Sequence, residues 1–113
     1  EIDQVLPKLK KILPKDFVLK ILENEPAQFA KETDLYIKRL AKSIEKITNK
    51  KAEFVGFNGA SDARFFNSVG TPAICFGPTG EGLHTDNEWV DIISLDIYYK
   101  ILVDFLTRLD KGL

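Results

Sequence analysis

A polar loop from Gly77 to Glu88 carries the residues of this sequence best suited to chemistry. Its His84 is the only histidine of the chain, and an aspartate, an asparagine and a glutamate follow at positions 86–88. A neutral imidazole is the commonest metal ligand in proteins, so His84 is a candidate metal ligand. Three glycines and a proline within the first six residues indicate an irregular loop. The alternative, that His84 is only a solvated or hydrogen-bonded loop residue, stays open.

A second polar loop, from Asn58 to Arg64, holds the other candidates. An arginine can grip a carboxylate through two parallel hydrogen bonds, so Arg64 beside a histidine suits a substrate carboxylate near a metal. Simpler roles stay open, because Asp62 can cap the turn behind it and Arg64 can form a surface ion pair. Glu88 can equally favour the start of a helix. The glycines that open the first loop lack the Lys-Ser/Thr ending of a phosphate-binding loop, which argues against nucleotide binding.

Each of these loops follows an apolar run that predicts a buried strand. Ala52–Phe57 precedes the loop of Arg64, and Pro72–Phe76 precedes the loop of His84. If the two strands are parallel neighbours, both loops leave the sheet at the carboxyl ends of the strands. We therefore expect Arg64 and His84 at the same edge of one sheet, with the imidazole at least partly exposed.

The remaining elements follow from apolar periodicity and from breakers. A three- and four-residue spacing predicts helices over Asp3–Leu13 and Thr33–Asn49, with Thr33 as the N-cap of the second. A last helix is expected to begin near Ser94 and to run nearly to the C-terminus. Phe17–Leu22 alternates as a strand, and the aperiodic segment Glu23–Ala30 is the best candidate for a domain boundary. Helices alternating with strands predict an α/β fold.

Composition bounds the functional class. The chain has 113 residues, of which 44% are apolar and 29% charged, and a net charge of −1. These values suit a globular domain that buries about 65% of its unfolded surface, and they give no sign of nucleic-acid binding. No apolar run reaches the length of about 20 residues that spans a bilayer. Cys75 lies in a predicted buried strand without a partner, which favours a reducing, cytoplasmic location. The lack of a methionine at position 1 suggests a cut chain.

The residues alone do not complete a catalytic site. A hydrolytic zinc ion needs about three protein ligands and an open position for water, and one histidine cannot supply them. No Ser-His or Cys-His pair has a convincing setting either. From the residues, the chain is a cytosolic α/β unit with a polar loop edge. A self-contained binding module without metal chemistry therefore stays an alternative.

Three motifs add a resemblance to a known family. Asn58–Phe66, Gly70–Pro78 and His84–Val90 resemble, in this order, the zinc aminoacyl metallopeptidases, the family of acetylornithine deacetylase, succinyl-diaminopimelate desuccinylase and carboxypeptidase G. The resemblance implies the C-terminal part of a dinuclear-zinc aminopeptidase-like catalytic domain at residues 30–113. Residues 1–29 resemble the last helix and strand of the α+β lid, or dimerisation, domain inserted in such enzymes.

The resemblance also implies roles for particular residues. His84 matches the histidine that binds one of two zinc ions, for which cobalt is an alternative metal. Arg64, with the backbone of Gly59 and Ala60, matches the group that holds a substrate carboxylate. The residues expected to support the two loops are Asp62, Asn87 and Glu88. The family often has threonine where Ala60 stands.

What this sequence lacks shapes the expected function. The family's His-x-Asp motif, its paired glutamates with the general base and its bridging aspartate have no counterpart here. The resemblance therefore implies part of an amidohydrolase that cleaves N-acyl amino acids or short peptides, with no catalytic residue in this chain and no activity on its own. The expected partners are the small substrate and the N-terminal part of the same enzyme. Two later strands are few for a sheet, so we also expect a homo-oligomer.

Overall fold

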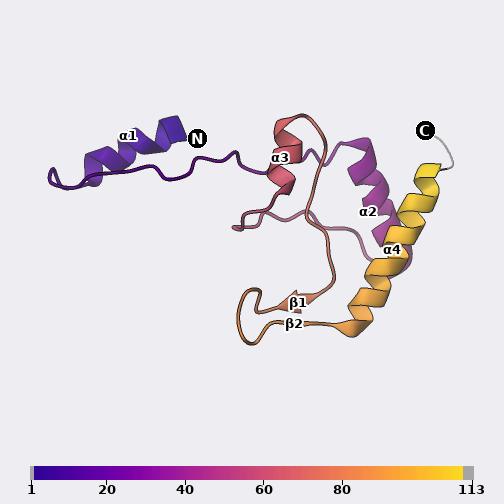
Figure 1. Ribbon diagram of the computed structural model, residues 1–113. Coiled ribbons are helices and arrows are strands. Elements are labelled where there is room, and N and C mark those ends of the chain that lie inside the picture. The colour runs from indigo at the N-terminus through magenta and orange to yellow at the C-terminus, as the bar shows by residue number, and fades with distance from the viewer. Residues whose placement is uncertain (1, 111–113) are drawn as a thin grey trace.

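The structure is a computed structural model and describes residues 2–110. Within that range it has four helices and one two-stranded antiparallel sheet (Figure 1). In chain order these are α1 (Ile2–Ile12), α2 (Leu35–Thr48), α3 (Ala63–Ser68), β1 (Gly80–Glu81), β2 (Trp89–Val90) and α4 (Ile92–Asp110). The three long helices were predicted, each within a few residues of its observed bounds.

The start of α2 is fixed by one side chain. Asp34 is the N-cap, and its Oδ1 accepts hydrogen bonds from the backbone N–H groups of Tyr36 (2.9 Å) and Ile37 (3.2 Å). These bonds satisfy two donors that the first turn leaves free. The predicted cap, Thr33, is therefore wrong by one residue. At the other end Asn49 is left-handed (φ 54°) and its N–H donates to Glu45 O at 2.9 Å, which ends the helix.

The start of α4 differs from the prediction in a way that matters for the site. Asp91, and not Ser94, caps it: Asp91 Oδ1 accepts from the Ile93 N–H at 2.8 Å. The Ser94 hydroxyl accepts instead from the Thr79 N–H (2.9 Å) and donates to Asp91 O (2.6 Å). Ser94 thus ties the first turn of α4 to the residue that leads into β1. This contact anchors the loop of His84 to the longest helix.

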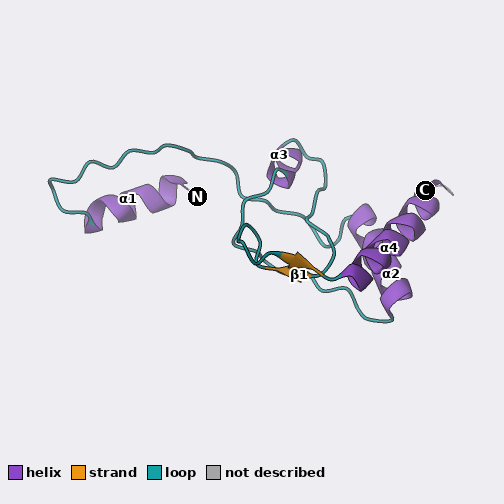
Figure 2. Ribbon diagram, turned by 60° about the horizontal axis from the view of Figure 1, so that its bottom comes forward, coloured by secondary structure: helices purple, strands orange, loops and turns teal. Residues whose placement is uncertain are grey.

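The core lies between α2 and α4, which run side by side in Figures 1 and 2. Within the described residues, the buried apolar side chains are Ile37 and Leu40 of α2 and Ile101 of α4. Phe76 extends the contact through its ring, whose centroid lies 5.2 Å from that of Tyr98. This core is small for a chain of this length, so few side chains hold the two helices together.

A charged cluster also joins the two helices. The carboxylate of Asp104 on α4 accepts from the hydroxyl of Ser43, which is fully buried on α2, at 2.8 Å. It also pairs with Lys46 of α2 and, at 2.7 Å, with Arg108 one turn along α4. The hydrogen bonds from Lys46 and Ser43, more than the charge of Arg108, hold the pKa of Asp104 below its usual value of 3.8.

We expect the stabilising effect of Asp104 to disappear in acid. Because its pKa is lower in the folded than in the unfolded chain, its contribution is complete above about pH 3.8 and is lost as the pH falls through the folded-state pKa. Asp104→Asn should therefore lower the melting temperature at pH 7, and by progressively less as the pH falls through the folded-state pKa. Asp96→Asn is the matched control, because the one ion pair of Asp96 within residues 2–110 is with Lys100 of the same helix, and both side chains are exposed. An equal effect of both variants at pH 7 would contradict this role.

The predicted strands are wrong for this chain. The segments Phe17–Leu22, Ala52–Phe57 and Pro72–Phe76 pair with nothing in residues 2–110, and the strands found there, β1 and β2, lie outside all three segments. A strand exists only through a partner that takes up its backbone N–H and C=O groups. The apolar alternation was present in the sequence, but no adjacent strand was available.

Much apolar surface consequently remains uncovered. The chain exposes 9789 Å², whereas a folded chain of this size exposes about 6,300 Å². Its radius of gyration is 19.0 Å, against about 13 Å for a compact domain. About half of the unfolded surface is buried, less than the sequence led us to expect. Figure 1 shows α1 far from the other helices.

None of the helices within residues 2–110 has the length and apolar character that a bilayer crossing needs.

Candidate functional site

His84 lies at the tip of the β-hairpin. Glu81 pairs with Trp89 and Gly80 with Val90, and the Asp91 N–H donates to Thr79 O at 2.8 Å beyond the last pair. A side chain at Gly80 would collide with the backbone carbonyl of Trp89, so this position needs glycine. The hairpin makes Gly82–Glu88 a short, closed loop with both ends fixed.

The backbone of His84 is left-handed, with φ 65°. It occupies the third position of the turn Gly82–Thr85, which the hydrogen bond from the Thr85 N–H to Gly82 O (2.9 Å) closes. A positive φ at that position is the mark of a type II turn, where glycine or asparagine is usual. A residue held in such a conformation costs on the order of 1–3 kcal/mol and persists only where its surroundings impose it. The turn and its hydrogen bonds therefore impose this conformation on His84.

Glu88 holds the turn closed. Its Oε2 accepts from the backbone N–H of His84 at 3.1 Å, and its own N–H donates to Thr85 O at 3.2 Å. Asn87 adds a bond from its N–H to Thr85 Oγ1 (3.3 Å). Both residues thus lie in the turn that carries the histidine. Glu88 is four residues ahead of α4, whose cap is Asp91.

The imidazole of His84 is free to bind a ligand. The residue is exposed, and no hydrogen bond to its ring occurs within residues 2–110. A metal ligand needs such an unshared ring nitrogen, so the residue fits that role. The same part of the chain has no group of three histidine, cysteine, aspartate or glutamate residues that could hold a metal ion. His84 therefore offers one ligand and not a complete site.

Arg64 lies at the start of α3 and is half buried. Its guanidinium carbon is 4.8 Å from the centroid of the Phe65 ring, a cation–π contact. Its Nε is buried without a hydrogen-bond partner in the described residues. A buried donor without a partner is costly, and a ligand oxygen would relieve that cost.

The loop before α3 is built differently from the prediction. Asp62 is the N-cap residue, but its carboxylate makes no capping hydrogen bond, so the side-chain cap considered for Asp62 is not found here. The Ser61 hydroxyl accepts from the Ala63 N–H at 3.2 Å instead. Gly59 lies so close to the exposed Phe57 ring that a side chain there would require the ring to move. Both Gly59 and Ala60 are exposed. The loop therefore leaves its backbone accessible.

Arg64 and His84 do not meet at one sheet edge. Figure 1 shows α3 at the top and the hairpin tip at the bottom, and both views keep them apart. The prediction required Ala52–Phe57 and Pro72–Phe76 to pair as parallel strands, and they are unpaired here. Without that pairing, no sheet within the described residues aligns the ends of the two segments.

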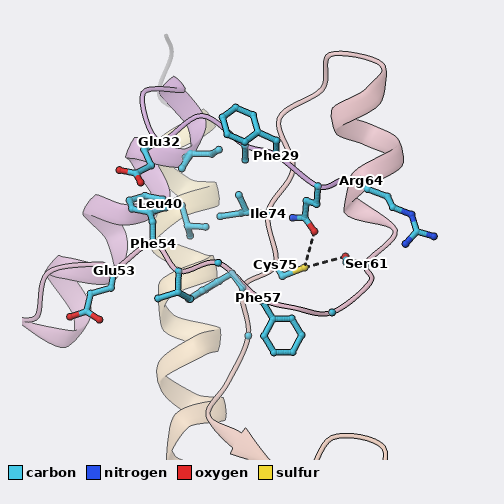
Figure 3. Close-up of a pocket in the computed structure, with 18 of the residues that line it drawn as sticks. Phe29, Glu32, Leu40, Glu53, Phe54, Phe57, Ser61, Arg64, Ile74 and Cys75 are labelled. Carbon is cyan, nitrogen blue, oxygen red and sulfur yellow. Dashed lines mark hydrogen bonds between the residues drawn. The ribbon is translucent and has the colours of Figure 1, made fainter. Parts of the chain in front are cut away.

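The two unpaired segments border an open hollow of about 1490 Å³ (Figure 3). Its walls are largely apolar and include Leu40, Phe54 and Ile74. Ligand pockets usually measure about 300–1,000 Å³, so this space is larger than a small molecule needs. The Arg64 guanidinium points away from Leu40 and Ile74 in Figure 3.

Cys75 was expected in a buried strand, and it is exposed at this hollow. Its Sγ lies 3.1 Å from Ser61 Oγ and 3.6 Å from Gln28 Oε1. The prediction was wrong because burial of the segment depended on a sheet that does not form here. Neither Gln28 nor Ser61 was distinguishable in the sequence, since they lie 47 and 14 residues from Cys75.

Comparisons with known proteins agree with the motifs. The sequence profile of the peptidase family M20/M25/M40 matches residues 7–108. Succinyl-diaminopimelate desuccinylases from two strains of Methylorubrum extorquens are 35% identical over 83 residues. The alignments cover 70% of this chain and 21% of each relative, so the chain spans about a fifth of the length of these curated relatives. No solved structure was found to match.

Proposed function

The chain belongs to the peptidase family M20/M25/M40, and from this premise we propose that it is the C-terminal part of a cytoplasmic, metal-dependent amidohydrolase. The substrate is an N-acyl amino acid, with a succinyl or acetyl group, or a short peptide. Desuccinylase relatives at 35% identity support this substrate class. The observation that carries the proposal is His84, presented with a free imidazole on a left-handed residue of a closed turn.

His84 is proposed to hold one of two zinc ions, with cobalt as an alternative metal. Such ions activate water and polarise a carbonyl oxygen. Arg64, with the N–H groups of Gly59 and Ala60, is proposed to bind the substrate carboxylate, while Asp62 supports that loop. The unpartnered Nε of Arg64 and the accessible backbone of the loop support this assignment. It requires that the loops come together when Ala52–Phe57 and Pro72–Phe76 gain partner strands.

Three further parts complete the proposal, and the uncovered apolar surface supports the first and the last of them. The rest of the polypeptide, which precedes this chain and carries the other metal ligands, covers the hollow beside α2. Residues 1–29 end a lid domain distinct from the catalytic part at residues 30–113. Without that cover the chain associates as a homo-oligomer, because exposed strand edges and apolar helix faces pair with one another. A purely monomeric chain in light scattering would contradict this association.

The test compares the complete enzyme with this chain. With zinc added, the complete enzyme should hydrolyse N-succinyl-diaminopimelate or N-acetylornithine, and the purified 113-residue chain should not exceed the rate in buffer. The expected difference follows from the single metal ligand of the chain. Hydrolysis by the chain alone would refute the assignment of the other ligands to the rest of the protein. A complete protein inactive on both N-acyl substrates and on dipeptides would favour a binding module.

A further inference from the structure

Thr85, the residue after His84, has a role that neither its type nor its place in the chain suggested. We propose that Thr85 is a positioning residue whose hydroxyl holds His84 in the left-handed conformation that presents the imidazole to the metal. The inference rests on the proposed function, because it assumes that His84 binds a metal ion. It concerns a residue whose hydroxyl bonds to backbone atoms of the turn.

The hydrogen bonds of the turn converge on Thr85. Its hydroxyl donates to Gly82 O at 2.7 Å, and its own N–H donates to the same oxygen at 2.9 Å. The hydroxyl oxygen accepts from the Asn87 N–H at 3.3 Å, and the carbonyl oxygen accepts from the Glu88 N–H at 3.2 Å. Thr85 thus bonds both to the residue that opens the histidine turn and to the two residues that close the loop.

These bonds act on His84 from both sides. Gly82 is two residues before it and is itself left-handed (φ 73°), with Asn87 O only 2.8 Å from where a side-chain carbon would stand. Glu88, which donates to Thr85 O, accepts the His84 N–H. If the Thr85 hydroxyl is removed, Gly82 O loses one of its two donors and the Asn87 N–H loses its acceptor. The turn then holds His84 less firmly in a backbone conformation that residues other than glycine disfavour.

Two substitutions separate the effect of the Thr85 hydroxyl from the effect of the rest of its side chain. Thr85→Val keeps the shape and the β-branch but removes the hydroxyl, whereas Thr85→Ser keeps the hydroxyl and removes the methyl group. Thr107→Val is the matched control: the Thr107 hydroxyl donates to Val103 O (2.7 Å) on the exposed surface of α4, away from the hairpin. Outer partners of a metal ligand typically contribute about 10- to 100-fold in metal affinity.

The experiment measures the zinc dissociation constant of the complete enzyme by competition with a chromophoric chelator. Thr85→Val should raise the dissociation constant of the more affected zinc ion by about 10-fold or more. Thr85→Ser and Thr107→Val should stay close to the wild type. A second measurement, hydrogen exchange of the His84 amide, should show faster exchange in Thr85→Val but not in Thr85→Ser. If the valine variant fails to fold, Thr85→Ala takes its place.

His84→Ala separates the role of Thr85 from the metal assignment. If His84→Ala loses zinc while Thr85→Val binds zinc like the wild type, the role of Thr85 is refuted and the proposed function stands. If Thr85→Ser lowers the affinity for zinc as much as Thr85→Val does, the hydroxyl is not responsible and the inference also fails. If His84→Ala binds both zinc ions like the wild type, the metal assignment itself is wrong, and the role of Thr85 falls with it.

Discussion

His84→Ala in the complete enzyme is expected to give the largest functional loss. Because His84 is proposed as a direct ligand, its removal should weaken the binding of one zinc ion by at least about 100-fold, more than the loss of an outer partner does. The metal supplies several kcal/mol of transition-state stabilisation, so kcat/KM should fall by at least about 1,000-fold. Zinc content after dialysis and steady-state hydrolysis of N-succinyl-diaminopimelate would measure the two effects.

Asp86→Asn is the control for this prediction. Asp86 lies two residues from His84 in the same exposed loop, and its carboxylate has no hydrogen bond within residues 2–110. The substitution should leave zinc content and kcat/KM within a few-fold of the wild type. If Asp86→Asn removed zinc and His84→Ala did not, the ligand in this loop would be the carboxylate and not the imidazole.

Ile101→Ala is expected to give the largest loss of stability. Its side chain is only 3% exposed, at the contact between α4 and α2. Truncating a buried isoleucine to alanine costs about 2–5 kcal/mol, through lost burial and the cavity left behind. Domains are stable by only about 5–15 kcal/mol, so we expect the melting temperature of the chain to fall by roughly 10 °C or more.

Ile92→Ala provides the comparison on the same helix. Ile92 is 79% exposed at the start of α4, so the same truncation should change the free energy of unfolding by no more than about 0.5 kcal/mol. Both variants are compared in the 113-residue chain by thermal and urea unfolding. Equal losses for the two variants would show that the contact between α2 and α4 is not the core of the chain.

Local sequence was sufficient to define the helices and the candidate residues. Apolar residues at three- and four-residue spacing, such as Ile37 and Leu40, predicted α2, and they became its buried face. Helix formation depends on contacts within one segment, so periodicity is sufficient to predict it. The breakers around His84 correctly indicated a turn, and the motif order led to the family that the comparisons support.

Contacts between distant segments set what those residues can do together. The segments Ala52–Phe57 and Pro72–Phe76 have the composition of strands, yet they stay unpaired, because a strand takes its hydrogen bonds from a neighbour and not from itself. Arg64 and Cys75 consequently lie where the sequence did not place them. Only the folded hairpin revealed that His84 is left-handed and that Thr85 bonds across its turn. The bonds of Thr85 form only when the loop Gly82–Glu88 closes. The sequence indicates a turn there but does not specify which hydrogen bonds close it.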